Sequence, residues 1–424
     1  MNYPDSHDVI IAGGGPAGTS AAIQLAAFGA RVLLVEEKKF PRAKLCGEFI
    51  SPECLTHFKR LGVLDQMTSA GGAALAETVF YSRRGHRVSV PSEWFGSGAS
   101  ALGLSRSEMD DKLLKRAKEA GVVVMEQTHA SGLIQERGSV LGISAKNADG
   151  VKEYRSLLTI DATGRARALA RHIATQVARA GKQQPKTAKH PFVAFKAHLE
   201  NARVARGACE IYFYRGGYGG LSSVEGGVSN LCFIVSADEV RLHESDPEVV
   251  MREVVMRNAR ASYTLAQAHA STPWLSVSFE RFGPRTLTPA DGLLTIGDAA
   301  SFIDPFTGSG MLMALESGQI AAEIIGRYLP RLRHAQGSDL PEFETLARDY
   351  RTAYSRGFNS RLRFSGLLRR AAFVPLFAET AMRLFGTSAR LRRRLARATR
   401  QQTRVLSEPL TAPGESPRSK GLHR

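Results

Sequence analysis

Apolar and polar positions alternate in blocks over the first forty residues. Residues 8–12 form a short apolar run that predicts a buried parallel strand, and a glycine-rich turn over 13–18 follows at once. Alanine-rich sequence up to Phe28 predicts a helix, and the run 31–36 predicts a second strand. This order of strand, turn, helix and strand predicts a βαβ unit with a parallel sheet.

Strand patterns dominate the middle of the chain. Residues 77–90 predict a β-hairpin, and residues 192–282 predict an antiparallel sheet that one helix near 247–260 interrupts. Parallel-strand character returns at 293–296, and the helix that follows is expected to end at Ile325. The middle of the chain therefore belongs to a different structural class from the N-terminal unit.

Three further segments connect these regions. Ser107 and Asp110 stand in capping-box register and predict the start of a helix. Residues 157–161 predict a buried strand that runs into a glycine turn at Gly164. The polar and basic segment 165–190 predicts a loop or linker.

The patterns together predict an α/β fold with a discontinuous Rossmann-like nucleotide-binding domain, an inserted β-rich substrate domain and a C-terminal helical region. The predicted boundaries are 1–75, 100–170 and 286–330 for the nucleotide-binding domain, 76–99 and 185–285 for the β-rich domain, 340–405 for basic C-terminal helices, and 406–424 for a disordered tail.

The first glycine turn has the spacing of a dinucleotide-binding fingerprint. Gly13 permits a tight turn, Gly15 lets the backbone approach a pyrophosphate, and Gly18 lets the helix pack closely on the strand. The helix N-terminus offers free N–H groups to phosphates. Glu36 ends the second strand, where a carboxylate can accept ribose hydroxyls. A glycine turn with a structural role alone is the alternative.

A second turn carries similar signals. Gly297 and Asp298 follow a buried strand, and Pro305 and the run 307–310 lead into a helix. An acid at a strand end can bind a ribitol or ribose hydroxyl, and a helix N-terminus can stabilise negative charge on an electron-rich ring. The alternative is a strand–loop–helix connection in which Asp298 caps a helix.

The distribution of charge and the spacing of the cysteines indicate which kinds of site and which compartment are expected. The net charge is +17, but residues 351–424 hold 17 Lys+Arg against 3 Asp+Glu, so the rest of the chain is close to neutral. The four cysteines show no metal-ligand or disulfide spacing, which predicts no metal site and a reducing, cytoplasmic compartment. Neither a secretory signal nor an apolar run of the ~20 residues that a membrane-spanning helix needs is visible.

The basic C-terminal segment allows two interpretations. Residues 361–385 mix arginines with bulky apolar residues, and residues 390–404 are a charge run with few large apolar residues. The first pattern is typical of helices that lie on the anionic inner surface of a membrane, so membrane contact through residues 361–404 is one interpretation. The alternative is a helix packed on the body with solvated arginines. Nucleic-acid binding is not expected.

These motifs resemble the FAD-binding landmarks of the para-hydroxybenzoate hydroxylase superfamily. The landmarks are Gly13–Gly18 with Glu36, Arg106 opening a helix, Asp161–Gly164, and Gly297–Asp298 followed by Pro305, Gly308 and Gly310. The run from Phe40 to Glu48, with Arg42 and Cys46, is similar to the geranylgeranyl reductase-like branch. Over the β-rich middle the resemblance is weak.

The resemblance implies FAD as cofactor, with NAD(P)H as electron donor, and a role for each matching position. The turn of Gly13, Gly15, Pro16, Ala17 and Gly18 would contact the pyrophosphate, and Glu36 would contact the adenosine ribose. Arg106 would contact the flavin side of FAD, Asp298 would contact the ribitol, and Gly308 to Gly310 would lie against the pyrimidine edge of the ring. Arg42 and Cys46 would lie near the ring, and Gly164 and Pro305 would lie in the flanking turns.

Two departures from the family pattern restrict the reaction. Thr163-Gly164 stands where related hydroxylases carry Asp-Gly, an acid linked to handling of the nicotinamide cofactor, which puts direct reduction by NAD(P)H in doubt. The tryptophan-containing signature of archaeal and plant geranylgeranyl reductases is not evident in residues 216–222. The paired-tryptophan signature of flavin halogenases is also missing, since Trp94 and Trp274 lie far apart. Halogenation is therefore not expected.

A few side chains remain as candidates on the substrate side. Cys46 is either a redox or proton-donating residue beside the flavin or a small buried hydrophobe. Tyr212, Tyr214 and Tyr218 line a substrate pocket or, as is commoner for strand aromatics, belong to the core. His198 is more typical of a satisfied strand histidine than of a catalytic base.

The sequence thus predicts an FAD-dependent oxidoreductase with a hydrophobic, isoprenoid- or polyketide-like substrate. It favours monooxygenation slightly, since that is the commoner activity of the superfamily. Reduction of a carbon–carbon double bond is the alternative, which Cys46 and Thr163 favour. A further alternative is a non-catalytic flavoprotein that docks to a partner or a membrane.

Overall fold

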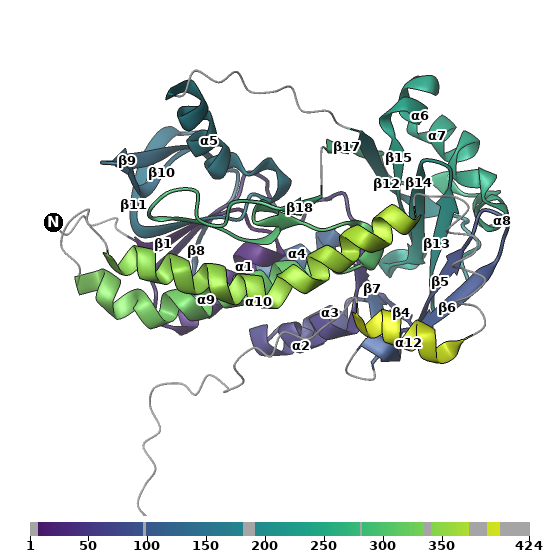
Figure 1. The fold of residues 1–424 in the computed structure, drawn as a ribbon, viewed down its shortest axis with the longest axis horizontal. Coiled ribbons are helices and arrows are strands. Elements are labelled where there is room, and N and C mark those ends of the chain that lie inside the picture. Colours follow the sequence, from purple (N-terminus) through teal and green to yellow (C-terminus); the bar gives the residue numbers. More distant parts are fainter. Residues whose placement is uncertain are drawn as a thin grey trace, which may run out of the picture.

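Two large β-sheets lie side by side, and two long helices run along one flank of the molecule (Figure 1). The computed structural model describes residues 7–95, 99–180, 191–279, 282–334, 341–372 and 388–398. The predicted tail at 406–424 lies outside the described residues.

The first sheet has seven strands in the order β8-β2-β1-β11-β10-β9, with β19 on the far side of the C-terminal half of β11. Its strands are β1 (His7–Ala12), β2 (Val32–Val35), β8 (Val123–Met125), β9 (His129–Glu136), β10 (Ser139–Asn147), β11 (Gly150–Asp161) and β19 (Leu293–Thr295). β1 pairs in parallel with both β2 and β11, as buried apolar runs predict. The carboxyl ends of β1 and β11 therefore meet at one edge.

The second sheet has eight strands in the order β16-β12-β15-β14-β13-β5-β6, with β17 also paired to β12. Its strands are β5 (Glu77–Tyr81), β6 (Arg87–Pro91), β12 (Phe192–Glu200), β13 (Ala208–Tyr214), β14 (Gly217–Ser223), β15 (Ser229–Ser236), β16 (His269–Ala270) and β17 (Leu275–Phe279). The predicted hairpin of β5 and β6 joins this sheet through a parallel pairing of β5 with β13.

Two smaller sheets lie at the junction of the large ones. They consist of β3 (Phe49–Ile50), β7 (Ala101–Gly103) and β4 (Ala73–Leu75), and of β18 (Gly283–Pro284) with β20 (Ser301–Phe302).

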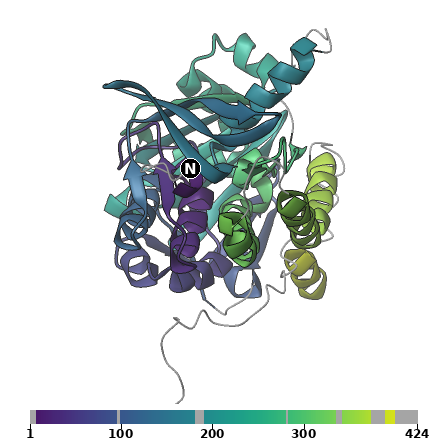
Figure 2. The ribbon, with the colours of Figure 1, turned by 90° about the vertical axis from the view of Figure 1, so that its left-hand side faces the viewer.

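Helices cover the first sheet and the outer face of the second. They are α1 (Pro16–Ala27), α2 (Pro52–Leu61), α3 (Leu64–Thr68), α4 (Arg106–Glu119), α5 (Ala168–Ala180), α6 (Ala237–Leu242), α7 (Pro247–Glu253), α8 (Ala259–Leu265), α9 (Gly310–His334), α10 (Pro341–Ala372) and α12 (Ala389–Ala398). Figure 2 shows α1, α9 and α10 in succession beside the first sheet.

The close approach of α1 and α9 depends on a glycine. A Cβ atom on Gly318 would lie 2.4 Å from the Ala17 carbonyl oxygen, so a larger residue would push the helices apart. Among the described residues, no helix is long and apolar enough to cross a membrane.

The structure confirms the predicted α/β class, with a Rossmann-like unit, a β-rich insert and C-terminal helices. Several local predictions were wrong. The cap of α4 is Ser105, whose side chain accepts a hydrogen bond from the Glu108 N–H, rather than the pair Ser107 and Asp110. The predicted linker contains helix α5, because Leu169 and Ile173 form an apolar stripe that packs on the first sheet.

Two helix lengths also differ from the prediction. The single helix near 247–260 is two helices, α7 and α8, because Asn258 has extended backbone and caps α8. A third helix, α6, precedes them. Helix α9 continues past Ile325 to His334, even though Pro330 lies inside it.

Arg361 does not belong to an exposed basic face, although it lies in the segment predicted to contact a membrane. Its side chain is 2% exposed and donates a hydrogen bond of 2.8 Å to Glu316 on α9. Residues 373–387 and 399–404 of that segment lie outside the described residues.

Candidate active site

The turn between β1 and α1 is shaped by two glycines in close contact with neighbouring backbone. A Cβ on Gly13, whose φ is +110°, would lie 2.4 Å from the Ala162 carbonyl oxygen, and a Cβ on Gly18 would lie 1.9 Å from the Gly13 carbonyl oxygen. Gly15 differs, because the nearest atom to its Cβ would be an Arg106 nitrogen at 3.9 Å. The backbone at Gly15 is therefore open to a ligand, while Gly13 and Gly18 hold the turn together.

Glu36 closes the other side of this turn. Its Oε2 accepts a hydrogen bond from the Gly14 N–H at 2.8 Å, and its Oε1 accepts one from the Lys38 N–H at 3.0 Å. These bonds fix the carboxylate at the edge of a cavity, which it lines. Because a carboxylate has about four lone-pair sites, Glu36 can still accept hydroxyl groups of a ligand.

Two arginines face Gly15 and share one buried acid. Asp110 on α4 is fully buried and accepts hydrogen bonds from Arg106 at 2.8 and 2.7 Å, while Arg42 lies 3.1 Å from it. Burial acts to lower the pKa of Arg106, but the charge of Asp110 and its hydrogen bonds outweigh burial and raise that pKa. The result is a fixed positive cradle for phosphate beside Gly15.

The second predicted turn supplies an acid from the opposite direction. Asp298 lies after β19 in a single 3-10 turn, Gly297–Ala299, and does not cap it. Its carboxyl group is half-buried and accepts no hydrogen bond from the described part of the chain. Burial raises the pKa of Asp298, and the nearby charges of Arg165, Arg106 and Lys44 oppose that rise. Such a carboxyl group is available to ligand hydroxyls.

These elements meet in a cavity of about 520 Å³ between the two large sheets. Of the predicted site residues, the cavity is lined by Gly13, Gly15, Pro16, Ala17, Glu36, Arg42, Cys46, Arg106, Gly164, Asp298, Pro305, Gly308 and Gly310. Gly18 does not line it and lies beneath the turn, where it contacts Gly13. The geometry fits FAD: a cationic cradle at an open glycine backbone, Glu36 for a ribose, and for the ribitol Asp298, whose carboxyl group accepts no hydrogen bond from the residues that the structure describes.

Thr163 has a structural task in this region. Its hydroxyl donates a 2.6 Å hydrogen bond to Asp161 and accepts one of 2.8 Å from the Ala168 N–H. The side chain thereby stabilises the first turn of α5. It is not free to replace the acid that related hydroxylases carry at this position.

Cys46 lines the cavity beside Arg106. The Glu48 N–H donates to its Sγ at 3.4 Å, and its carbonyl oxygen accepts a hydrogen bond from Asn230 on β15 at 3.1 Å. Burial is the largest effect on the pKa of the thiol and raises it, while Arg106 opposes the rise. The thiol is therefore protonated at neutral pH and suited to hold a proton.

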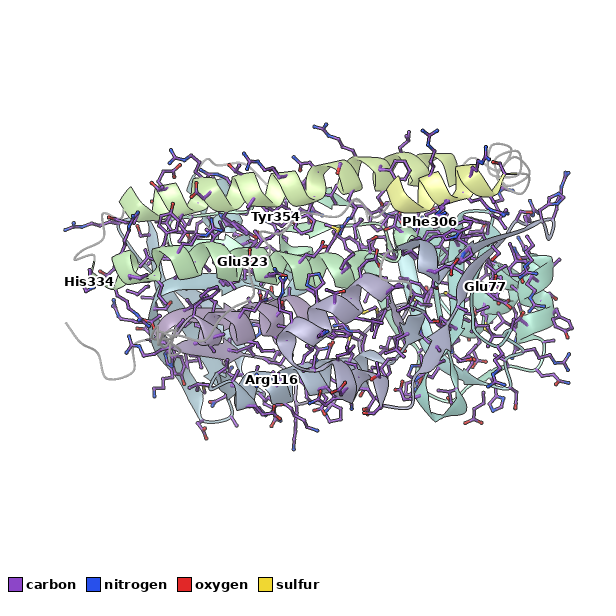
Figure 3. The ribbon with its side chains drawn as sticks, turned by 90° about the horizontal axis from the view of Figure 1, so that it is seen from below. Glu77, Arg116, Phe306, Glu323, His334 and Tyr354 are labelled. Atoms are coloured by element: carbon purple, nitrogen blue, oxygen red, sulfur yellow. The ribbon has the colours of Figure 1, made fainter. Side chains whose placement is uncertain are left out.

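The far end of the cavity is aromatic. The Phe306 ring lies 5.7 Å from Phe80, 5.6 Å from Phe213 and 5.5 Å from Tyr218, measured between ring centroids. Figure 3 labels Phe306 near the end of α9 that faces the second sheet. Of the three candidate tyrosines, only Tyr218 lines the cavity, and Tyr212 and Tyr214 belong to the core of the insert.

Three lining residues of the site had no role predicted for them. Arg165 follows Gly164 directly, Phe306 lies between Pro305 and Thr307, and Glu48 ends the run that contains Cys46. Each of the three residues therefore lies next to, or at the end of, a motif that the sequence analysis had identified. Contacts between Glu48 and the second sheet involve residues about 150 positions away, which no local pattern predicts.

The family described as FAD binding domain matches residues 6–326, about three quarters of the chain. The chain belongs to this FAD-binding family. It is an FAD-dependent oxidoreductase of the geranylgeranyl reductase-like branch, as the motifs predict.

Two relatives illustrate this placement. Digeranylgeranylglycerophospholipid reductase 1 of Methanopyrus kandleri is 30% identical over 333 residues, which cover 75% of this chain and 80% of the relative. Menaquinone reductase of Mycobacterium tuberculosis is 27% identical over 401 residues, which cover 90% of this chain and 89% of the relative.

Solved structures share the fold. The flavin-dependent brominase Bmp2 superposes with a TM-score of 0.72 at 21% identity and covers 93% of each chain. A geranylgeranyl bacteriochlorophyll reductase-like protein from Thermoplasma acidophilum superposes with a TM-score of 0.68 at 20% identity, over 94% of this chain and 92% of that protein. At these identities the similarity concerns the fold alone.

Proposed function

We propose that this FAD-dependent oxidoreductase reduces carbon–carbon double bonds in an isoprenoid chain. The observation that carries the proposal is the position of the Cys46 thiol, which lines the same cavity as the cationic cradle and the aromatic residues and lies beside Arg106. The relatives named as reductases of isoprenoid lipids and of menaquinone give further support.

Each part of the site has a task in this reaction. When bound, FAD supplies the electron pair and hydrogen that one carbon of the double bond receives. Arg42, Arg106 and the Gly15 backbone, which line the cavity, would bind its phosphates, and Glu36 and Asp298 would bind its hydroxyl groups. The aromatic end orients the apolar chain and excludes water, and the Cys46 thiol holds the proton for the second carbon.

We propose NAD(P)H as the electron source. The position of Thr163 argues against the nicotinamide handling of related hydroxylases, so reduction by the dinucleotide must use other groups. Anaerobic bleaching of the FAD-loaded enzyme by NADH or NADPH tests this. Bleaching only by dithionite or a reduced protein would point to another donor.

Monooxygenation, which the sequence favours slightly, is the second candidate. The observation in its favour is the aromatic end itself, because Phe80, Phe306 and Tyr218 can hold a flat, polyketide-like ring as well as a polyene. In that case oxygen would enter the product.

One experiment separates the two reactions. FAD-loaded enzyme receives NADPH, oxygen-18 gas and either an unsaturated isoprenoid lipid, menaquinone or a host lipid extract, and products are analysed by mass spectrometry. Reduction predicts products that gain only two hydrogens per double bond and that also form without oxygen. A product that carries the heavy oxygen would instead establish a monooxygenase.

We further propose that the basic helix α12 brings the cavity to an anionic membrane surface. Arg390, Arg393 and Arg394 are exposed on α12, which packs beside β6 and the 3-10 turn that ends at Phe95, a residue of the cavity wall. Flotation with vesicles rich in phosphatidylglycerol tests this, with R393E/R394E as the variant and Arg252→Glu on α7 as control. Loss of binding in the first variant alone supports the proposal, and equal binding in all three proteins contradicts it.

A further inference from the structure

One acid and two bases form a buried cluster where the Cys46 loop meets the second sheet. Glu48 is 1% exposed, Lys196 on β12 is 3% exposed, and His198, two residues further along the same face of β12, has a side chain that is 15% exposed. Lys196 Nζ lies 3.1 Å from Glu48 Oε1, and His198 Nε2 lies 2.7 Å from Glu48 Oε2. The two halves of the molecule thus share this cluster beside the cavity, which Glu48 lines.

The backbone holds Glu48 in an unusual conformation to make these contacts. Its φ is +52°, in the left-handed region that non-glycine residues rarely adopt. The carboxylate also accepts a hydrogen bond from the Arg106 N–H at 3.0 Å, at the first residue of α4. Such strain tends to occur where the position of a side chain matters for function.

His198 Nε2 has two neighbours within hydrogen-bond distance, but it can form a hydrogen bond with only one of them in a given protonation state. Nε2 lies 3.0 Å from Lys196 Nζ as well as 2.7 Å from Glu48. A ring nitrogen carries either one hydrogen or one lone pair. If Nε2 donates to Glu48, it cannot accept from the Lys196 ammonium, and two fully protonated bases at this distance would repel each other. Nε2 can therefore form a hydrogen bond with only one of these two neighbours at a time.

The cluster also connects solvent to the cavity. His198 is its most exposed member, and Glu48 is the member that lines the cavity, with its N–H on the Cys46 sulfur. The other charged and titratable groups that face it are Arg106 on α4 and Cys46 and Cys232 at the cavity wall. Burial acts to raise the pKa of Glu48, but His198 and Lys196 outweigh burial and lower it.

We propose that Glu48, Lys196 and His198 form a proton relay that carries a proton from solvent to Cys46. The inference rests on the proposed reduction. One carbon of the double bond receives a hydride, the other receives the Cys46 thiol proton, and a thiolate remains. The cluster reprotonates that thiolate across the cavity and takes a new proton from solvent at His198, so one proton is consumed for each double bond.

The first test measures coupling between the cluster and Cys46 without catalysis. Holoenzyme is alkylated with iodoacetamide over a range of pH, and modification of Cys46 is counted by peptide mass spectrometry. Glu48→Gln removes a negative charge near the thiol and should lower the alkylation midpoint by about one pH unit, whereas Lys196→Met leaves Glu48 without its cation and should raise it by a similar amount.

His269→Gln is the matched control, because His269 is an exposed histidine on β16, beside β12. Its midpoint should equal that of the wild type. FAD retention and melting temperature show that each variant folds. Midpoints in Glu48→Gln and Lys196→Met that equal the wild-type value would overturn the proposal.

The second test asks whether His198 transfers a proton. His198→Gly should slow double-bond reduction by about 100-fold, the lower end of the range for acid–base catalysis, and added imidazole should restore part of the rate. A merely structural histidine gives no rescue, and that result would overturn the relay. A hydroxylated product together with shifted Cys46 midpoints would instead refute the proposed reduction and leave the coupling of the cluster to Cys46 in place.

Discussion

The two ends of the cavity differ in what they are made of. The end at β1 and α1 is glycine backbone and charged side chains, with Arg42 and Arg106 held by the buried Asp110. The end at the second sheet is mainly aromatic and aliphatic, around Phe306 and Tyr218. The first end suits a constant, charged cofactor, and the second suits an apolar substrate that can change without disturbing the first.

The largest effect is expected where backbone contacts leave no space. Gly18→Val should abolish FAD retention and destabilise the fold by about 3 kcal/mol or more, because a Cβ there would lie 1.9 Å from the Gly13 carbonyl oxygen. Chemical denaturation and bound flavin per chain measure this. Gly366→Ala on α10, where a Cβ meets nothing within 4 Å, is the control and should be neutral or slightly stabilising. Normal flavin content in Gly18→Val would contradict the described turn.

Removal of one charged partner should be the next largest effect. Arg106→Met leaves the buried Asp110 with Arg42 alone, so FAD affinity should fall by about 100-fold, as expected for a broken buried ion pair. Titration of the apoprotein with FAD measures this. Lys115→Met on the same helix removes an exposed pair with Asp111 and should change affinity less than twofold. If the two substitutions changed FAD affinity equally, the result would contradict the proposal that Arg106 binds the cofactor.

A substitution at the apolar end should leave the cofactor in place. Gly220 on β14 lines the cavity, and a Cβ there would lie 3.1 Å from Ile211 Cδ1. Gly220→Val should therefore reduce turnover of long isoprenoid chains by about tenfold, through lost space, with unchanged FAD content. Gly132→Val on β9, whose Cβ would make only ordinary contacts, controls for a valine in a strand. Loss of FAD in Gly220→Val would show that the two ends are not independent.

The smallest expected effect is a change of stability with pH, which arises from His57 on α2. Burial lowers the pKa of His57 on α2 from 6.5 to about 4, so the unfolded chain binds a proton there more readily than the folded one. Stability should fall by about 1 kcal/mol between about pH 7 and about pH 5.5, since protons then favour the unfolded state. His57→Gln should remove this loss, as measured by urea denaturation at both pH values. An unchanged slope would mean that His57 is not the group responsible.

The two ends also differ in how well the sequence predicts them. Gly13, Gly18 and Glu36 act within one βαβ unit, so their spacing along the chain fixes their geometry. The cluster of Glu48 with Lys196 and His198 joins residues about 150 positions apart and needs the pairing of two domains. The sequence analysis predicted a loop where helix α5 lies, because most residues of this segment are polar and its buried apolar face consists mainly of Leu169 and Ile173.

Anaerobic reoxidation of the flavin tests the central claim most directly. Enzyme is loaded with FAD, reduced and freed of excess reductant, and then mixed without oxygen with an unsaturated isoprenoid lipid or menaquinone while the absorbance of oxidised flavin is followed. The account predicts that the absorbance returns and that one saturated bond appears for each flavin. Flavin that stays reduced with each of these substrates until oxygen is admitted, and then yields an oxygenated product, would contradict it.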